Sequence, residues 1–273
     1  MPPATIRLVA VDLDGTLVRN EENRIEMEEA EALRQAQAAG VWVVVATGRP
    51  HKSAEELLQR IGMPDAYVIS FNGAMVKRCG EEKPLRHLVV PQELAREVVE
   101  MGVHRRLYLL YFSGDEPYVT HMGKWGWIYW KRTGLKPTPV GDLRGMLAAQ
   151  ATKIIVMDEP QRLAPLATEC QQRWAGRLYV TPSRPDILEF MHPDANKGTA
   201  LRWLAEHLGL RPQETLALGD SHNDIPLLEA AGFAVAMPGA DVATKSAADW
   251  VAGDTQAPVA DVLSRFVLAR QEY

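Results

Sequence analysis

Two aspartates, Asp12 and Asp14, end an apolar run in the stretch IRLVAVDLDGTL at residues 6–17. In an extended chain every second side chain points the same way, so both carboxylates face one side. Two anions there need a cation between them, or one of them must bind a proton. Mg²⁺ commonly binds one or two carboxylates together with the phosphate oxygens of a substrate. The stretch therefore indicates a magnesium and phosphate site; a strand followed by an ordinary Asp-Gly turn is the alternative.

A second acidic cluster, GDSHND at residues 219–224, follows the short apolar run 215–218. Asp220 can join the same metal ion, and Asp224, at the start of a predicted helix, can cap that helix or orient a ligand. His222 is left out of the predicted site because a hard Mg²⁺ ion prefers oxygen ligands.

Two further segments carry groups that suit a phosphate. Thr47 and Gly48 follow the apolar run 41–46, and a hydroxyl with a backbone N–H can hold a phosphate there. An ordinary loop with a helix N-cap is an equal interpretation. Lys197 stands at the start of a predicted helix, where a positive charge opposes the helix dipole unless an anion is bound. A surface lysine is the alternative.

The dipeptide Asn72-Gly73 follows a predicted strand at residues 67–71. It favours a tight hairpin turn into a returning strand at 74–77. A substrate contact by Asn72 is the secondary interpretation.

These residues need elements to position them, and the hydrophobic pattern supplies an α/β order. Continuous apolar runs predict strands buried on both faces of a parallel sheet, and good helix formers lie between them. Open sheets of this kind bind ligands at the carboxyl ends of their strands. Strands are predicted at 8–11, 41–46, 67–71, 215–218, 233–236 and 249–251, and helices at 21–39, 53–61, 199–207, 225–231 and 258–269.

Between residues 84 and 191 the pattern changes to many short strands with two helical stretches, which predicts an inserted α+β domain. Residues 1–83 and 192–273 then form one core. The insert contains the aromatic run KWGWIYW at 124–130. We interpret this run as core or interface, with stacking on a sugar or base as the alternative.

Composition excludes several classes of protein. The chain has 273 residues and a net charge of −5 without a basic run, so neither nucleic acid nor a membrane surface is an expected partner. No apolar segment is long enough to span a bilayer, and the start does not resemble a signal peptide. Cys79 and Cys170 lie far apart and are expected to be free thiols in a reducing cytoplasm.

Four motifs stand in order along the chain: DLDGT at Asp12, TGR at Thr47, NKG at Lys197 and GDSHND at Asp220. Together they resemble the haloacid dehalogenase-like (HAD) superfamily of phosphohydrolases. The insert, with ATGRP, FNG, NKG and GDxxND, is similar to the Cof-like branch, which carries an α/β cap. The resemblance covers nearly the whole chain. It implies a Rossmann-like core built from both chain ends and a cap, at 84–191, that selects the substrate.

The resemblance also implies a role for each motif residue. Asp12 is the expected nucleophile and a metal ligand. Asp14 is expected to bind the metal through its backbone carbonyl and to act as general acid and base through its side chain. Asp220 is the third expected metal ligand. The phosphate is expected to contact Thr47, Gly48, Lys197, Asn223 and the backbone N–H of Leu13, while Asp224 supports the metal site.

The predicted activity is Mg²⁺-dependent hydrolysis of small phosphorylated metabolites, sugar phosphates among them, in the cytoplasm. A phosphomutase would use the same aspartyl-phosphate but return the phosphoryl group to a sugar. A phospho-accepting signalling domain would also use Mg²⁺ and an aspartate, but it would be shorter and lack a cap. A dehalogenase would need no metal, so the second aspartate and GDxxND argue against it.

Overall fold

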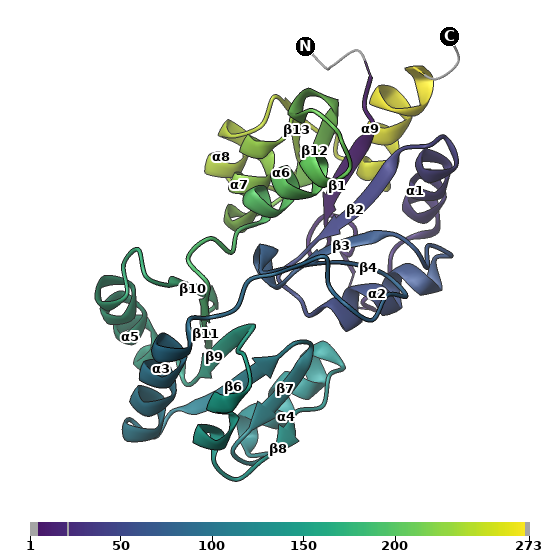
Figure 1. Cartoon of the computed structure of the whole chain (residues 1–273). Helices are drawn as coiled ribbons and strands as arrows, with labels where there is room; N and C mark the ends of the chain where they lie inside the picture. Colours follow the sequence, from purple (N-terminus) through teal and green to yellow (C-terminus); the bar gives the residue numbers. More distant parts are fainter. Residues whose placement is uncertain (1–4, 21, 271–273) are drawn as a thin grey trace. The chain divides into compact units, whose positions relative to one another are not determined.

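The computed structural model describes residues 5–20 and 22–270. The chain forms two compact units (Figure 1). The larger contains the described residues up to Arg86 and those from Asn196 onward, and the smaller contains His87–Ala195.

The larger unit is built on an eight-stranded sheet in which β1 (Leu8–Asp12) lies between β12 (Thr215–Gly219) and β2 (Trp42–Ala46). β1 is parallel to both neighbours. Parallel strands end at the same edge, so the residues after β1, β2 and β12 come together although they are far apart in sequence. The order continues through β13 (Phe233–Ala236) and β14 (Trp250–Val251) on one side, and β3 (Tyr67–Ser70), β4 (Met75–Arg78) and β5 (Arg86–His87) on the other.

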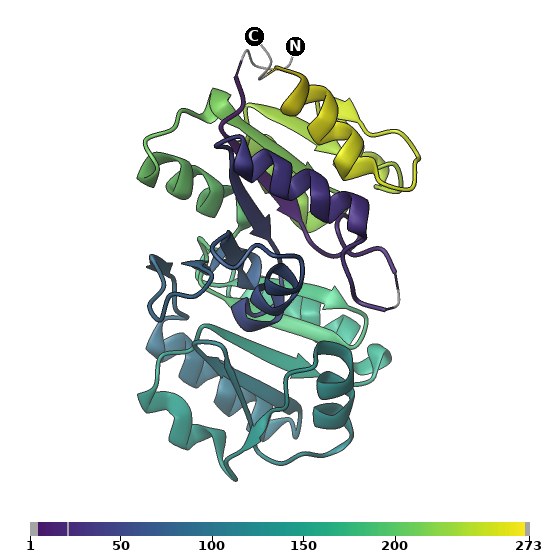
Figure 2. The ribbon, with the colours of Figure 1, turned by 90° about the vertical axis from the view of Figure 1, so that its right-hand side faces the viewer.

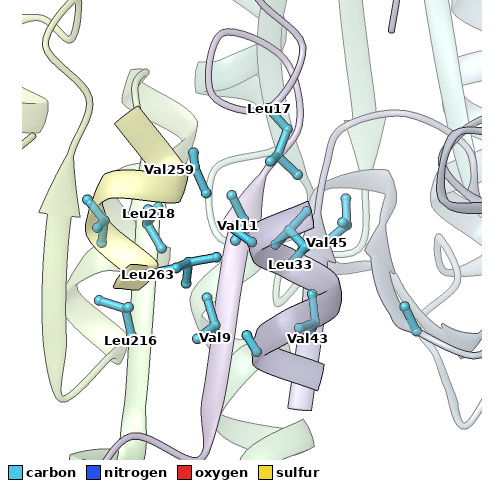
Figure 3. Packing of buried hydrophobic residues seen from close by; sticks show 14 of the residues in the cluster. Val9, Val11, Leu17, Leu33, Val43, Val45, Leu216, Leu218, Val259 and Leu263 are labelled. Carbon is cyan, nitrogen blue, oxygen red and sulfur yellow. The ribbon is translucent and has the colours of Figure 1, made fainter. Parts of the chain in front are cut away.

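β1 is buried along its whole length because both faces of the sheet are covered. Val9 and Val11 belong to one apolar cluster with residues of α1 (Met27–Ala38) and α9 (Pro258–Phe266), as Figure 3 shows. Leu8 and Ala10 belong to a second cluster. Figure 2 shows α1 and α9 side by side over the sheet. This two-sided packing fixes the direction in which Asp12 leaves the strand.

The second cluster contains residues of α6 (Lys197–His207) and α7 (Ile225–Ala230), which begin next to two of the sequence motifs. The remaining elements of this unit are α2 (His51–Arg60), α8 (Val242–Ser246) and the short 3₁₀ turns η1 (Phe71–Gly73), η3 (Pro212–Glu214), η4 (His222–Asp224) and η5 (Leu268–Arg270).

The smaller unit has a six-stranded sheet in the order β10-β11-β9-β6-β7-β8, antiparallel except for the pair of β7 and β8. Residues of α3 (Gln92–His104) and α5 (Pro160–Arg173) form one apolar cluster with alternate residues of β6, β9 and β11. The strands are β6 (Tyr108–Ser113), β7 (Glu116–Val119), β8 (Thr138–Pro139), β9 (Lys153–Met157), β10 (Tyr179–Arg184) and β11 (Ile187–Met191), with the 3₁₀ turn η2 (Leu143–Ala148).

The predicted fold class, a parallel-sheet core with an inserted α+β unit, is confirmed. One predicted helix begins later than expected: α1 starts at Met27 rather than near residue 21. The Asn20 side chain binds the Arg24 backbone and Glu26 instead, which holds the chain before α1 in a non-helical form. Within the insert, the apolar triplet Leu88-Val89-Val90 predicts a short strand, and this prediction is wrong, because the strand in this segment, β5, contains only Arg86 and His87.

The aromatic run at 124–130 lies in a helix, α4 (Lys124–Thr133), which the sequence analysis did not predict. Tyr129 is buried and packs edge-on against Phe112, whereas Trp127 is half exposed. Tyr129 therefore lies in the core, as one half of the prediction has it, whereas Trp127 does not; an interface role for Trp127 stays a prediction. Among the described residues, no helix has the length and apolar character needed to cross a membrane.

Candidate active site

Three aspartates from two neighbouring strand ends meet at one place. Asp12 ends β1, and Asp220 and Asp224 follow β12. Each offers a carboxylate oxygen, and these three oxygens all lie within 4.8 Å of one another. The parallel pairing of β1 with β12 produces this convergence across about two hundred residues of sequence.

Lys197 supplies the positive charge of the cluster. Its side chain is 1% exposed, and Nζ donates to Asp12 Oδ1 and to Asp224 Oδ1, each at 2.6 Å. α6 begins at this lysine, and the Asn196 side chain caps the helix by accepting a hydrogen bond from Thr199 N–H at 2.8 Å. The alternative of a surface lysine is therefore wrong.

One ammonium group does not neutralise three carboxylates, and the pKa values reflect this imbalance. Burial, then Asp224, raise the pKa of the Asp12 carboxyl well above its usual range, against the opposing effect of Lys197. Burial, then Asp224, also raise the pKa of Asp220. Burial by itself would lower the pKa of Lys197, but Asp12 and Asp224 outweigh it and the net shift is upward.

The two oxygens of Asp12 have different surroundings. Oδ1 accepts from Lys197, whereas Oδ2 is buried and accepts no hydrogen bond from the described part of the chain. A buried anionic oxygen without a donor is costly unless a cation or a reacting group meets it. Oδ2 thus has the surroundings of a metal ligand or of a nucleophile.

Asp224 holds its own loop in place. Its Oδ2 accepts from the backbone N–H groups of Asp220 and Ser221, each at 3.1 Å, and Oδ1 accepts from Lys197. Because both oxygens already have protein donors, Asp224 suits the orientation of Asp220 and Lys197 better than direct contact with a metal ion.

Thr16 is a residue that the sequence analysis did not place in the site. It is buried, and its hydroxyl donates to Asp220 Oδ1 at 3.0 Å. The signal was present in the sequence, because a hydroxyl residue directly follows Asp14-Gly15. Its partner, however, lies 204 residues further along the chain.

Gly15 gives a direct test of whether Asp220 must keep its position. Gly15 has φ +93°, and a Cβ there would overlap the Asp220 carboxylate. For the Mg²⁺ site predicted from the sequence, Gly15→Ala is expected to weaken binding of the ion roughly 10- to 100-fold, because it displaces a candidate ligand. Calorimetric titration with Mg²⁺ measures this affinity. Gly40→Ala is the matched control, since Gly40 has φ +82° with no atom within 4 Å of the new Cβ. Equal Mg²⁺ affinities in the two variants would contradict the expectation.

Asp14 does not belong to the group formed by the other three aspartates. Its side chain is 53% exposed and forms a two-oxygen ion pair with the Arg49 guanidinium, through Nε at 3.1 and 2.9 Å and through Nη2. Arg49 belongs to the TGR motif, but the sequence analysis assigned roles only to Thr47 and Gly48. The ion pair of Arg49 with Asp14 joins residues 35 positions apart, so only the tertiary structure shows it.

The loop after β2 lies beside the turn that follows β3. Thr47 is buried, and its hydroxyl oxygen accepts from the Arg49 N–H at 3.1 Å, so the hydroxyl hydrogen is available for another acceptor. A Cβ on Gly48 would lie 2.9 Å from Asn72 Oδ1. Asn223 Nδ2 donates to the same Asn72 oxygen at 3.3 Å. Thr47, Gly48 and Asn223 therefore gather around Asn72.

The Leu13 side chain is buried, and its carbonyl accepts from Val18 N–H at 2.7 Å, which closes the turn after β1.

A second group of possible metal-binding side chains, His51, Glu55 and Cys79, also offers atoms within 4.8 Å of one another. Burial raises the pKa of the Cys79 thiol to about 12, which favours the neutral thiol over the thiolate that metals bind. Cys79 and Cys170 are both free, as expected, and both are buried.

Comparisons with known proteins agree with this geometry. A sequence profile of the haloacid dehalogenase-like hydrolases matches residues 9–263. Phosphatase YwpJ of Bacillus subtilis is 30% identical over 271 residues, covering 90% of this chain and 94% of that protein. The HMP-PP phosphatase of Cronobacter sakazakii is 29% identical over 242 residues, covering 85% and 84%.

The crystal structure of TM0651 from Thermotoga maritima superimposes with a TM-score of 0.87 at 27% identity, covering 96% of this chain and 97% of that one. The family profile spans both halves of the larger unit and all of the inserted unit. The resemblance inferred from the four motifs is confirmed: the chain belongs to the haloacid dehalogenase-like hydrolase family.

Proposed function

We propose that this protein is a Mg²⁺-dependent phosphatase that hydrolyses small phosphorylated metabolites through an aspartyl-phosphate on Asp12. The observation that carries the proposal is the arrangement around Asp12. One oxygen is held by the buried Lys197, and the other, Oδ2, has no hydrogen-bond donor within residues 5–20 and 22–270 and lies near Asp220. Phosphoryl transfer needs this combination of an anionic nucleophile and nearby positive charge.

The cluster fits a divalent cation, because the carboxylates of buried Asp12 and Asp224 and of half-buried Asp220 lie around the ammonium group of Lys197. In addition, Asp12 Oδ2 has no hydrogen-bond donor among the described residues. Asp12 and Asp220 would hold the ion, together with the backbone carbonyl of Asp14, and oxygen ligands of this kind suit Mg²⁺. When bound, Mg²⁺ would offset the repulsion between Asp12 and an anionic phosphate. Asp224 and Thr16 keep Asp220 in position.

In the first step, an Asp12 carboxylate oxygen attacks phosphorus. A bond forms between this oxygen and phosphorus, and the bond from phosphorus to the ester oxygen breaks. The Asp14 carboxylic acid gives its proton to the leaving oxygen, so an alcohol departs rather than an alkoxide. Because Arg49 holds the Asp14 carboxylate in this structure, the acid role requires that this ion pair opens when substrate binds.

In the second step, Asp14, now a carboxylate, takes a proton from water as the water oxygen attacks phosphorus. The bond from phosphorus to Asp12 breaks, and inorganic phosphate leaves. Lys197, Thr47, Gly48, Asn223 and the N–H of Leu13 would bind the phosphate oxygens. Lys197 also stabilises the negative charge that develops during transfer.

Two named relatives support a small substrate. One is called an HMP-PP phosphatase, and another, YwtE of Bacillus subtilis, is called a 5-amino-6-(5-phospho-D-ribitylamino)uracil phosphatase. By their names, both act on small phosphorylated molecules. We propose the same class of substrate here, with sugar phosphates included.

The test is the release of phosphate from p-nitrophenyl phosphate by the purified 273-residue chain. Release is expected with Mg²⁺, to be lost after chelation with EDTA, and to return when Mg²⁺ is added again. A panel of phosphorylated metabolites then ranks substrates by kcat/KM. Transfer of the phosphoryl group to a second sugar hydroxyl, without net phosphate release, would assign the protein to the phosphomutases instead.

A further inference from the structure

The turn after β3 has a backbone that most residues avoid. Phe71, Asn72 and Gly73 have φ values of +51°, +54° and +101°, so two consecutive residues with a Cβ lie in the left-handed region. Such conformations are sparsely populated and persist where the surrounding structure fixes them. They gather at functional sites, so an observed pair of this kind calls for a role.

Contacts with three other segments hold this turn. Phe71 N–H donates to the Arg49 carbonyl and Asn72 N–H to the Thr47 carbonyl, each at 3.0 Å. On the opposite side, Gly73 lies so close to the Asn196 carbonyl that a Cβ would overlap it. The turn is therefore packed between the loop that follows β2 and the start of the helix that carries Lys197.

The Asn72 side chain adds a contact to a third segment. It is 5% exposed, and its Oδ1 accepts from Asn223 Nδ2 at 3.3 Å. The other end of the Asn223 amide is also held, because Asn223 Oδ1 accepts from Ser221 Oγ at 2.6 Å. With one Nδ2 hydrogen directed at Asn72, the second hydrogen of that amide has a fixed direction.

We propose that Asn72 is a positioning residue, which orients the Asn223 amide toward the substrate phosphate and keeps Asn223 in register with Thr47 and Gly48. This inference rests on the proposed function, since it assumes that these residues bind phosphate. Asn72 acts through Asn223 and need not touch the substrate. The left-handed turn places the Asn72 side chain beside Asn223.

A substitution of Asn72 by glycine tests the role of the side chain without straining the left-handed backbone. Asn72→Gly accepts φ +54° without strain and removes the whole side chain, the amide with its Cβ. It is expected to lower kcat/KM for p-nitrophenyl phosphate about 10- to 100-fold, because small misplacements of binding groups are costly. Asn23→Gly is the matched control, since Asn23 is exposed and has φ +53° outside the candidate site. It is expected to leave kcat/KM unchanged.

A double-mutant cycle tests whether Asn72 acts through Asn223. In the Asn223→Ala background, Asn72→Gly is expected to lower kcat/KM less than about threefold further, because its partner is already gone. Asn72→Asp keeps an acceptor for Asn223 and also tolerates this backbone. It is expected to raise KM, since its charge repels phosphate, while kcat stays within about threefold of the wild type.

Three results would overturn the inference: wild-type kinetics in Asn72→Gly, additive losses in the cycle, or a kcat in Asn72→Asp as low as in Asn72→Gly. Thermal melting of each variant shows whether the protein is folded at the assay temperature. If Asn72→Gly is unfolded there, the kcat of Asn72→Asp is compared with that of the wild type, and a loss of more than tenfold overturns the inference. Failure of the proposed function looks different, because the wild-type protein itself would then release no phosphate.

Discussion

Asp12→Asn is expected to reduce phosphate release from p-nitrophenyl phosphate by about 10³- to 10⁴-fold. Asparagine has the same shape but no anionic oxygen to attack phosphorus, so the covalent route is closed. The loss corresponds to roughly 4–5 kcal/mol of transition-state stabilisation. The fold should not suffer, since the substitution removes one of the three neighbouring carboxylate charges and leaves the Lys197–Asp224 pair in place.

Acid-quenched samples analysed by mass spectrometry after proteolysis show where the phosphoryl group resides. Wild-type protein should carry it transiently on the peptide that contains Asp12, and Asp12→Asn should not. Asp142→Asn, which changes a half-exposed carboxylate paired with Arg144 in the inserted unit, is the control and should keep full activity. Unaffected turnover in Asp12→Asn would exclude the proposed nucleophile. A long-lived phosphorylated Asp12 in the wild type would favour a signalling role.

Lys197→Met is expected to combine a large loss of stability with a loss of activity. Removal of the ammonium leaves Asp12 and Asp224 buried without their shared partner, and breaking a buried ion pair in this way costs about 3–5 kcal/mol. For a chain of this size the melting temperature should fall by roughly 10 °C. Activity should fall by about 10²-fold or more at a temperature where the variant is still folded, because a phosphate-binding charge is gone.

Lys153→Met separates these two effects. Lys153 is also a buried lysine, paired with Glu189 at 3.0 Å in the inserted unit. Its replacement should lower the melting temperature for the same reason, yet retain measurable phosphate release with Mg²⁺. Calorimetry gives the stability, and the p-nitrophenyl phosphate assay gives the activity. If Lys197→Met kept wild-type kcat/KM while folded, Lys197 would be a structural residue only.

The sequence carried enough local information to predict most strands and the order of the motifs. Runs such as 8–11 and 216–218 are apolar throughout, and this pattern belongs to strands covered on both faces. Helix starts were less certain: α1 begins at Met27 because the Asn20 side chain competes for the backbone that precedes it. The helix at 124–133 was missed because its aromatic residues lie on both its buried and its exposed sides, Tyr129 on the first and Trp127 on the second, so they do not mark one apolar face in the sequence.

Residue types at the strand ends were determined by the sequence alone: carboxylates after β1 and β12, a hydroxyl and a glycine after β2, and a lysine at the start of α6. What each of them contacts was decided only by the tertiary structure. The hydrogen bonds of Thr16 with Asp220 and of Asn72 with Asn223 join residues far apart in the chain. Hydrophobic periodicity in the sequence cannot predict such pairs, because it depends only on residues within a few positions of one another. Burial, which sets the charge balance around Asp12 and Lys197, likewise arises only when strands and helices from both halves of the chain pack together.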